Sequence, residues 1–183
     1  MSSSKLKSQL RQHLRRKRNA LNTDQVQRHS KIIVEKICNS PLWHQSQQIG
    51  IYLPFNNEVD LTALLYTNKS CFIPSIQGTD MQFHRHHERL NLITTSFGLS
   101  QPKFISRHQR PDMDLCIMPL VGFDHQGHRL GMGGGYYDRY FENNKNTVLW
   151  GVAHAIQEYD ELPNDPWDVK LHGIITEQTW LTI

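Results

Sequence analysis

Apolar and polar positions along the chain first follow a helical pattern. The segment 4–19 repeats leucine at helical spacing, so we predict a helix there. Asn22 can cap a second helix, because Gln25 stands three residues later and can hydrogen-bond back to the cap. The apolar face of this second helix continues to about Asn39. The chain therefore opens with two consecutive helices.

From residue 48 onward the pattern changes to short apolar runs. Strands are predicted at 48–53, 71–75, 115–121, 148–153 and 173–177, with an alternating, edge-type strand at 81–86. Pro74 should end the second of these strands, and 173–177 should be the last. We expect short helices at 61–65 and from 136 to about 144, an irregular stretch or short helix at 90–98, and a surface loop at 103–111. Strands that alternate with helices, without a repeating unit, indicate a single α/β domain with a mostly parallel sheet.

The most distinctive stretch follows the strand at 115–121. It holds four of the chain's eleven glycines within five residues, which we call the glycine segment: Gly131, Met132, Gly133, Gly134 and Gly135. Glycines let a backbone approach an anion closely, and successive amide groups in such a turn attract phosphate. A helix beginning near Gly135 would add its partial positive end. This order of strand, turn and helix predicts a phosphate site.

Charged side chains flank the glycine segment. Arg129 and Arg139 can donate forked hydrogen bonds to phosphate oxygens, and Asp138 stands where it can bind Mg²⁺. The segment matches neither common phosphate-binding pattern, because GxGxxG would need glycine where Tyr136 stands and GxxxxGK[ST] does not occur. The alternative is a turn without a ligand, since glycine-rich turns after strands are common.

A longer run around this segment carries a family resemblance. Phe123-Asp124, Gly127 and the stretch RLGMGGGYYDR from Arg129 to Arg139 resemble the signature of the 5-formyltetrahydrofolate cyclo-ligase, or methenyltetrahydrofolate synthetase, family. The match extends over nearly the full length, so the resemblance implies one domain, 1–183, with a three-layer α/β/α fold. It also implies an ATP-dependent ligase that cyclises 5-formyltetrahydrofolate to 5,10-methenyltetrahydrofolate through a phosphorylated formyl intermediate, releasing ADP and phosphate.

The resemblance also implies roles for individual residues. The ATP-binding residues would be Lys7, Arg11, Arg129, Leu130, Gly131, Met132, Gly133, Gly134, Gly135, Tyr136 and Tyr137. The folate would contact Leu53, Glu58, Met132, Gly133, Gly134, Gly135 and Tyr136. Catalysis would depend on Arg129, Tyr136 and Tyr137, and Mg²⁺ would be bound by Asp138 and Asp168. The chain departs from the family pattern at Gln101, where an acid is usual, which puts a role for that position in doubt.

Composition limits where and how such an enzyme would work. Residues 1–19 hold seven basic residues and no acid, whereas the remainder holds 13 basic and 17 acidic residues, so the net charge of +3 reflects a local basic arm. We therefore expect no general nucleic-acid surface. Three cysteines far apart indicate a reducing compartment. With no secretory pattern and no long apolar run, we expect a cytoplasmic monomer that binds small molecules and no membrane.

Other interpretations of the chain remain. A sugar-phosphate isomerase or an acyl-CoA transferase could use a similar α/β scaffold without ATP. The basic arm could instead contact RNA, form a solvated helix or act as a transit peptide. A metal site at His84, His86 and His87 is not favoured, because no cysteine or acid joins these histidines at a recognised ligand spacing.

Overall fold

The first two helices form where the apolar pattern places them. In the computed structural model, which describes residues 3–96, 98–105 and 109–183, α1 spans Ser3–Asn19 and α2 spans Thr23–Cys38. The Asn22 side chain accepts from the Gln25 backbone, and the Gln25 side chain accepts from the Asn22 backbone, each over 2.9 Å. This is the predicted capping box. The other helical elements are α3 (Pro41–Gln45), η1 (Thr62–Tyr66), α4 (Tyr136–Phe141) and η2 (Ala155–Gln157).

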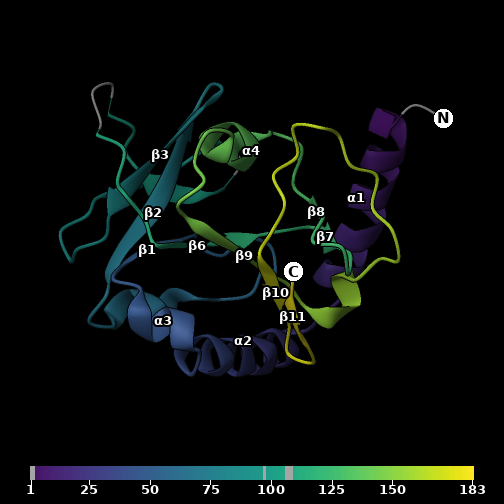
Figure 1. Cartoon of the computed structure of the whole chain (residues 1–183), viewed down its shortest axis with the longest axis horizontal. Coiled ribbons are helices and arrows are strands. Elements are labelled where there is room, and N and C mark those ends of the chain that lie inside the picture. The colour runs from purple at the N-terminus through teal and green to yellow at the C-terminus, as the bar shows by residue number, and fades with distance from the viewer. Residues whose placement is uncertain (1–2, 97, 106–108) are drawn as a thin grey trace.

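A seven-stranded sheet forms the centre of the molecule (Figure 1). Its order is β11-β10-β9-β6-β1-β2-β3, and its five inner strands run parallel. The two edge strands, β3 and β11, are antiparallel to their neighbours. The mostly parallel sheet is therefore confirmed. Its strands are β1 (Gln48–Ile51), β2 (Ser70–Gln77), β3 (Asp80–Arg85), β6 (Leu115–Pro119), β9 (Val148–Val152), β10 (Gly173–Ile175) and β11 (Trp180–Thr182).

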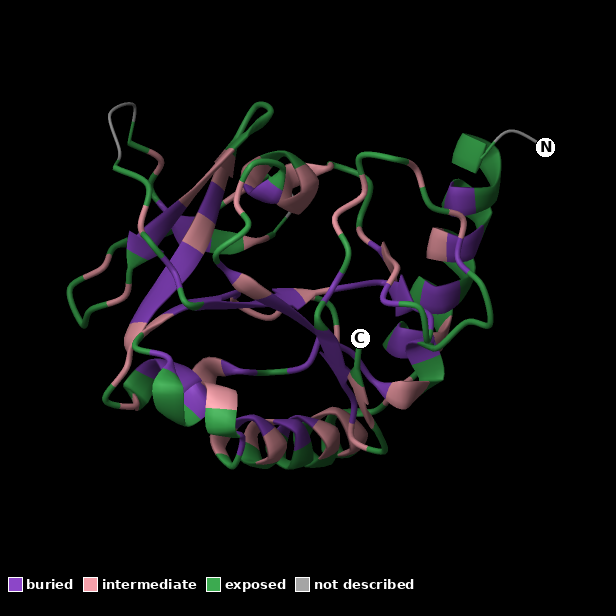
Figure 2. Cartoon of the chain, viewed as in Figure 1, coloured by how far each residue is buried: buried purple, intermediate pink, exposed green. Residues whose placement is uncertain are grey.

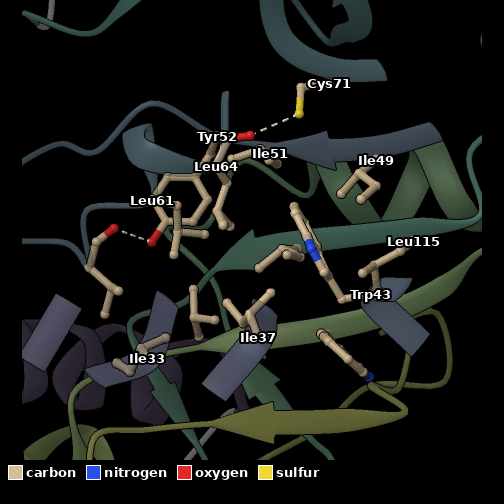
Figure 3. Packing of buried hydrophobic residues seen from close by; sticks show 14 of the residues in the cluster. Ile33, Ile37, Trp43, Ile49, Ile51, Tyr52, Leu61, Leu64, Cys71 and Leu115 are labelled. Carbon is tan, nitrogen blue, oxygen red and sulfur yellow. Dashed lines mark hydrogen bonds between the residues drawn. The ribbon is translucent and has the colours of Figure 1, made fainter. Parts of the chain in front are cut away.

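Alternate residues of the inner strands pack on opposite faces of this sheet. Ile51 lies in one apolar cluster with Ile37 of α2 and Trp43 of α3 (Figure 3). Cys116 lies in a second cluster with Phe141 of α4. Since side chains along a strand alternate with a period of two, both faces are buried, as Figure 2 shows for the strands. Helices on both faces give the three layers.

Helix α1 packs at the side of the sheet instead of on a face (Figure 1). Its Leu10 and Leu14 form a separate buried cluster with Val121, Leu130 and Leu162. Val121 precedes and Leu130 belongs to a short antiparallel ribbon, β7 (Gly122–Phe123) with β8 (Arg129–Leu130), which sequence reasoning missed. The apolar stripe of α1 therefore fixes this helix against the turn that leads into the glycine segment.

The prediction that Pro74 ends its strand is wrong. Strand β2 continues through Pro74, which lies opposite Phe83 of β3. The parallel neighbour β1 pairs with β2 only from Ser70 to Phe72. Beyond that point β2 has no β1 partner to which it must donate a hydrogen bond, so a proline is tolerated there.

Three further differences concern short hairpins. Within 90–98 and just beyond, β4 (Leu92–Thr94) pairs with β5 (Ser100–Pro102) where an irregular stretch or short helix was expected; residue 97 itself lies outside the described residues. The expected loop at 103–111 also lies partly outside them, at 106–108. The strand at 173–177 ends at Ile175 and is not the last, since β11 follows.

The described helices are short or polar. None of them has the length and apolar character that crossing a bilayer requires.

Candidate active site

The glycine segment adopts a backbone that side chains would obstruct. Gly133 and Gly135 have φ angles of +101° and +63°, in the region that favours glycine. A Cβ atom at Gly134 would lie 2.5 Å from the ring of Tyr136. Gly135 then caps the N-terminus of α4. Local geometry therefore favours glycine at 133, 134 and 135, and the turn passes directly into a helix as the sequence predicts.

Two cavities lie on either side of this segment. The first, which we call the polar cleft, has a volume of about 490 Å³ and is lined mainly by glycines and charged side chains of α1, α4 and the 165–168 turn. The second, the apolar pocket, has a volume of about 280 Å³ and is lined mainly by apolar side chains. Both cavities are lined by Arg129, Gly131, Gly134 and Asp138. The glycine segment is thus the wall between two chemically different cavities.

Helix α1 supplies two cations to the polar cleft. Lys7 donates to Asp165 over 2.7 Å and to Asp168 over 2.5 Å. Burial lowers the pKa of Lys7, but the hydrogen bonds to the two carboxylates outweigh it and leave that pKa raised. Arg11 Nε donates to the carbonyl oxygen of Gly131 over 2.9 Å, which places its guanidinium against Gly133. The basic arm therefore reaches the glycine segment through defined contacts.

Arg129 is held from two sides. Its Nη2 donates to Asp138 Oδ1 over 2.6 Å, and its Nη1 donates to the carbonyl oxygen of Val169. Only 5% of the side chain is exposed. Arg139, in contrast, is exposed and donates to the carbonyl oxygens of Thr79 and Gly134. Arg129 is therefore oriented rigidly at the wall between the cavities.

Carboxylates gather in the polar cleft. Asp138 and Asp168, which are 30 positions apart, both line it, together with Asp165. Asp138 receives both of its hydrogen bonds at Oδ1, and within the described residues its Oδ2 has no hydrogen-bond partner. Oxygen donors of this kind suit Mg²⁺. Asp165 was missed by sequence reasoning, because only the folded chain brings it within reach of Lys7.

One member of a buried ion pair, Glu58, lines the apolar pocket. Glu58 is 8% exposed, so it is not an ordinary loop acid. Its Oε1 lies 3.3 Å from Nη1 of Arg18, and its Oε2 accepts from the backbone N–H of Phe55 over 3.1 Å. Burial raises the pKa of Glu58 to about 6, although the charge of Arg18 opposes the rise. Glu58 is therefore a desolvated carboxyl group in a cavity that is lined mainly by apolar side chains.

Arg18 was not identified from the sequence. It lies fully buried at the C-terminal end of α1, and its Nε and Nη2 have no hydrogen-bond partner among the described residues. Burial lowers its pKa, and Glu58 only partly offsets that effect. Burying a guanidinium whose donors are not all hydrogen-bonded costs free energy of folding. The charge of Arg18 therefore stabilises the ionised form of Glu58 more than it stabilises the fold.

The two tyrosines of the motif point toward the apolar pocket. Tyr136 donates to the carbonyl oxygen of Gly78 over 2.9 Å, which ties α4 to the β2–β3 turn. Tyr137 packs edge-on against Phe83, with ring centroids 6.4 Å apart, and burial raises its pKa well above the usual value. Leu53 and Met132 also line this pocket. Within the described residues, Met132, Tyr136 and Tyr137 line the pocket and not the cleft, whereas Gly133 and Gly135 line the cleft alone.

Gln101 closes one side of the apolar pocket. Its amide group accepts from the backbone N–H of Ile76 over 3.0 Å and donates to the carbonyl oxygen of the same residue over 2.9 Å. These two hydrogen bonds join the β4–β5 hairpin to β2, as the backbone bonds of a neighbouring strand would. In this chain, position 101 therefore makes a structural contact in the pocket wall with an amide group, where an acid is usual in the family pattern.

Comparison with known proteins gives a consistent result. The model of the 5-formyltetrahydrofolate cyclo-ligase family matches residues 3–177. The 5-formyltetrahydrofolate cyclo-ligase of Haemophilus influenzae is 30% identical over 180 residues, which cover 92% of this chain and 96% of that protein. The enzyme of the same name from Escherichia coli K12 is 29% identical over 174 residues, covering 89% and 96%.

Solved structures agree with the sequence match. The NMR structure of Aquifex aeolicus 5,10-methenyltetrahydrofolate synthetase superposes with a TM-score of 0.82 at 32% identity, covering 97% of this chain and 92% of that one. The 5,10-methenyltetrahydrofolate synthetase of Mycoplasma pneumoniae gives a TM-score of 0.73 at 27% identity, covering 93% and 98%. With the motif, the fold and the full-length match in agreement, the chain belongs to the 5-formyltetrahydrofolate cyclo-ligase family.

Proposed function

We propose that the reaction of this family takes place across the glycine segment, with ATP in the polar cleft and the folate in the apolar pocket. That reaction is the ATP-dependent cyclisation of 5-formyltetrahydrofolate to 5,10-methenyltetrahydrofolate, with release of ADP and phosphate. The observation that carries the proposal is the shared wall, since Arg129, Gly131, Gly134 and Asp138 line both cavities. A phosphoryl group in one cavity would then face a formyl group in the other.

The chemistry requires two reactants to meet at such a wall. A formamide oxygen is a poor leaving group, so the γ-phosphoryl group is first transferred to it and ADP leaves. The N10 nitrogen of the folate then attacks the activated carbon and loses its proton. The carbon–oxygen bond breaks, phosphate departs and the ring is closed. Both steps depend on positioning and on stabilising negative charge, more than on covalent chemistry by the protein.

The polar cleft provides the positive charge for the first step. Lys7, Arg11 and Arg129, with the amide groups of the glycine segment, would bind the triphosphate. Arg129 is the most important of the three, because its fixed orientation places it beside both co-substrates. Preoriented charge of this kind stabilises a transition state without reorganising during the reaction.

The acids of the cleft fit a divalent cation. Asp138 and Asp168 would hold Mg²⁺, with Asp165 close by on the same cleft wall. When bound there, Mg²⁺ would offset charge between the phosphates of ATP. Lys7 already shares Asp168 and Asp165 through its ammonium group, so it would help to hold these carboxylates in place.

The apolar pocket suits the reduced pterin. An ionised Glu58 would accept hydrogen bonds from the paired N–H donors of the amino-pyrimidine edge, and Arg18 would keep it ionised. Tyr136 or Tyr137 would contact the formyl group or N10, and the surrounding apolar side chains would exclude water. Leu53 and Met132 would pack against the ring system.

Further parts of the proposal concern the state of the protein. We expect residues 1–183 to act as one domain and as a cytoplasmic monomer. The three cysteines are free, as a reducing compartment requires. Three cations of the basic arm, Lys7, Arg11 and Arg18, face the cavities or the interior, which weighs against RNA binding by this arm. Sedimentation or gel filtration would detect a dimer.

The test of the reaction is the absorbance of the methenyl product formed from 5-formyltetrahydrofolate, with and without Mg-ATP. We expect product only when Mg-ATP is present. Product formation without nucleotide would favour a different enzyme. Crystals grown with ADP test the location independently, because nucleotide density far from Arg129 and Asp138 would contradict the placement proposed here.

A further inference from the structure

Three potential metal ligands meet at a place that neither cavity uses. His29 comes from α2, His154 immediately precedes η2, and Glu177 follows β10. Their ligand atoms all lie within 4.8 Å of one another. His154 is fully buried, whereas the side chains of His29 and Glu177 are 20% and 9% exposed. None of the three lines the polar cleft or the apolar pocket.

His29 lies close to both of the other ligands. Nδ1 of His29 lies 3.0 Å from Nδ1 of His154 and 3.6 Å from Oε1 of Glu177. Two ligands at about 2.0–2.2 Å from one tetrahedral Zn²⁺ ion would lie roughly 3.3–3.5 Å apart. These two spacings lie close to that separation on either side, and the third pair, His154 with Glu177, lies within 4.8 Å, so side-chain adjustment would bring all three ligands to one ion.

Outer hydrogen bonds already orient two of the three ligands. His154 Nε2 lies 3.0 Å from the carbonyl oxygen of Asn57, to which only a protonated Nε2 can donate. This fixes the tautomer and leaves Nδ1 of His154 unprotonated, with its lone pair facing Nδ1 of His29. Glu177 Oε2 accepts from the backbone N–H of Ala155 over 3.0 Å, which turns Oε1 toward the histidines. Metal-binding histidines and carboxylates are typically held by such second contacts.

We propose that His29, His154 and Glu177 form a binding site for a divalent transition metal ion, with Zn²⁺ as the ion that their chemistry fits best. Two imidazole nitrogens and one carboxylate oxygen are a known three-ligand set for zinc, and water would complete the tetrahedron. The partial exposure of His29 gives the ion and this water access from solvent. The hard oxygen-only ligands that Mg²⁺ prefers are not what this site offers.

Proton balance is simple at this site. Without metal, the contact between the two Nδ1 atoms requires one proton, and because His154 carries its own on Nε2, that proton sits on Nδ1 of His29. Metal binding moves the tautomer of His29 to Nε2–H and releases no net proton from a neutral ring. One carboxylate and a dication leave the site with a net charge of +1.

The site would connect distant parts of the chain. It ties α2 to the end of β10, where Lys36 of α2 already donates to the carbonyl oxygens of Thr176 and Glu177. Through His154 it also contacts Asn57, the neighbour of Glu58. We therefore expect the metal to raise the melting temperature.

The experiment is a competition titration of Zn²⁺ against a chromogenic chelator, using the untagged full-length protein in excess Mg²⁺. Three variants are compared with the native chain. His29→Gln and Glu177→Gln each remove one ligand at a side chain that is not fully buried, which spares the interior. The matched control is His86→Gln with His87→Gln, which removes two imidazoles from another part of the surface.

We expect one tight Zn²⁺ ion per native chain and per control chain, and binding at least about 100-fold weaker in His29→Gln and in Glu177→Gln. Co²⁺ should give visible absorption bands in the native protein and not in His29→Gln. Equal Zn²⁺ affinity in the native protein and His29→Gln, or loss of binding in the control, would overturn the proposal. The proposal would also be overturned if the native protein did not bind Zn²⁺, or if Zn²⁺ did not raise its melting temperature.

Discussion

The polar cleft and the apolar pocket share a wall, but the pKa of the paired basic group shifts in opposite directions at the two cavities. In the cleft, one ammonium group meets two carboxylates, and their hydrogen bonds outweigh the burial of Lys7, so its pKa is raised. In the pocket, one guanidinium meets one carboxylate, burial prevails, and the pKa of Arg18 is lowered. Replacing one charged side chain should therefore have a larger effect in the lone buried pair than in the shared, partly solvated cluster.

Replacing Arg129 by alanine should produce the largest loss, because this side chain lines both cavities. We expect kcat/KM to fall about 10²- to 10³-fold, as for the removal of a preoriented charge. Steady-state formation of the methenyl product measures this. Arg129→Lys should recover only part of the activity, since lysine lacks the forked geometry. A melting curve checks the fold, and normal turnover in a folded Arg129→Ala variant would contradict the role of Arg129.

Replacing Glu58 by glutamine separates the two cavities. The KM for the folate should rise about 10- to 100-fold, because hydrogen bonds to a charged acceptor are lost, while the KM for ATP stays within about twofold. The native enzyme should also lose folate affinity as pH falls through about 6, where Glu58 gains a proton. This acidic limb should disappear in the variant. An equal rise in both KM values would show that the cavities do not act separately.

The unliganded protein offers a second test of the buried pair. The pKa of Glu58 is raised in the fold, from 4.5 to about 6, so the native state binds more protons than the unfolded state between these values. The contribution of Glu58 to the free energy of unfolding should then be fully present below about pH 4.5. It should fall by ~2 kcal/mol as the pH rises to about 6. Urea unfolding of the native protein and of Glu58→Gln at pH 4.5 and 7 isolates this contribution. A difference that does not depend on pH would rule it out.

In the polar cleft, replacing a single cation should have a smaller effect on activity, because several cations would bind the triphosphate together. Lys7→Met or Arg11→Met should raise the KM for ATP about tenfold each, with the KM for the folate nearly unchanged. Initial rates at varied concentrations of each co-substrate measure both. Lys5→Met, which changes a more exposed cation of the same helix, is the control. A loss of folate affinity in Arg11→Met would contradict the assignment of ATP and the folate to separate cavities.

The smallest effect on activity is expected from Gln101. Gln101→Glu exchanges an N–H donor for a charge and breaks the bond to the carbonyl oxygen of Ile76, so unfolding should become easier by about 1–3 kcal/mol. The folate KM should rise only a few-fold, because the hairpin wall loosens without losing a ligand. Chemical denaturation and the folate KM measure the two effects. Unchanged stability would show that this amide is not what holds β5 to β2.

Local signals predicted much of this molecule. The capping box at Asn22 and the glycine segment could be predicted because each depends on neighbours in the chain, and the mostly parallel sheet could be predicted from the alternation of strands with helices. The hairpin of β4 with β5 could not, since its three-residue strands carry little periodicity and are fixed by Gln101. Strand β11 was missed for a similar reason: it is short and pairs at an edge.

The candidate site was predictable to the same extent. The motif placed Arg129, Tyr136 and Asp138 in one region, and the folded chain brings Asp168 and Glu58 to the same two cavities. Arg18 and Asp165 stayed hidden, because their partners lie 40 and 158 positions away along the chain. A residue whose role depends on a distant partner leaves no local pattern.

Helix α1 lines the polar cleft with Lys7 and Arg11 near one end, and at the other end Arg18, eleven positions after Lys7, contacts Glu58 of the apolar pocket. At 1.5 Å per residue, these ends are about 16 Å apart on a single rigid element. A co-substrate that steadies this helix lowers the entropy that the other must remove on binding. Thermodynamic linkage then demands reciprocity: by whatever factor ATP tightens the folate, the folate must tighten ATP.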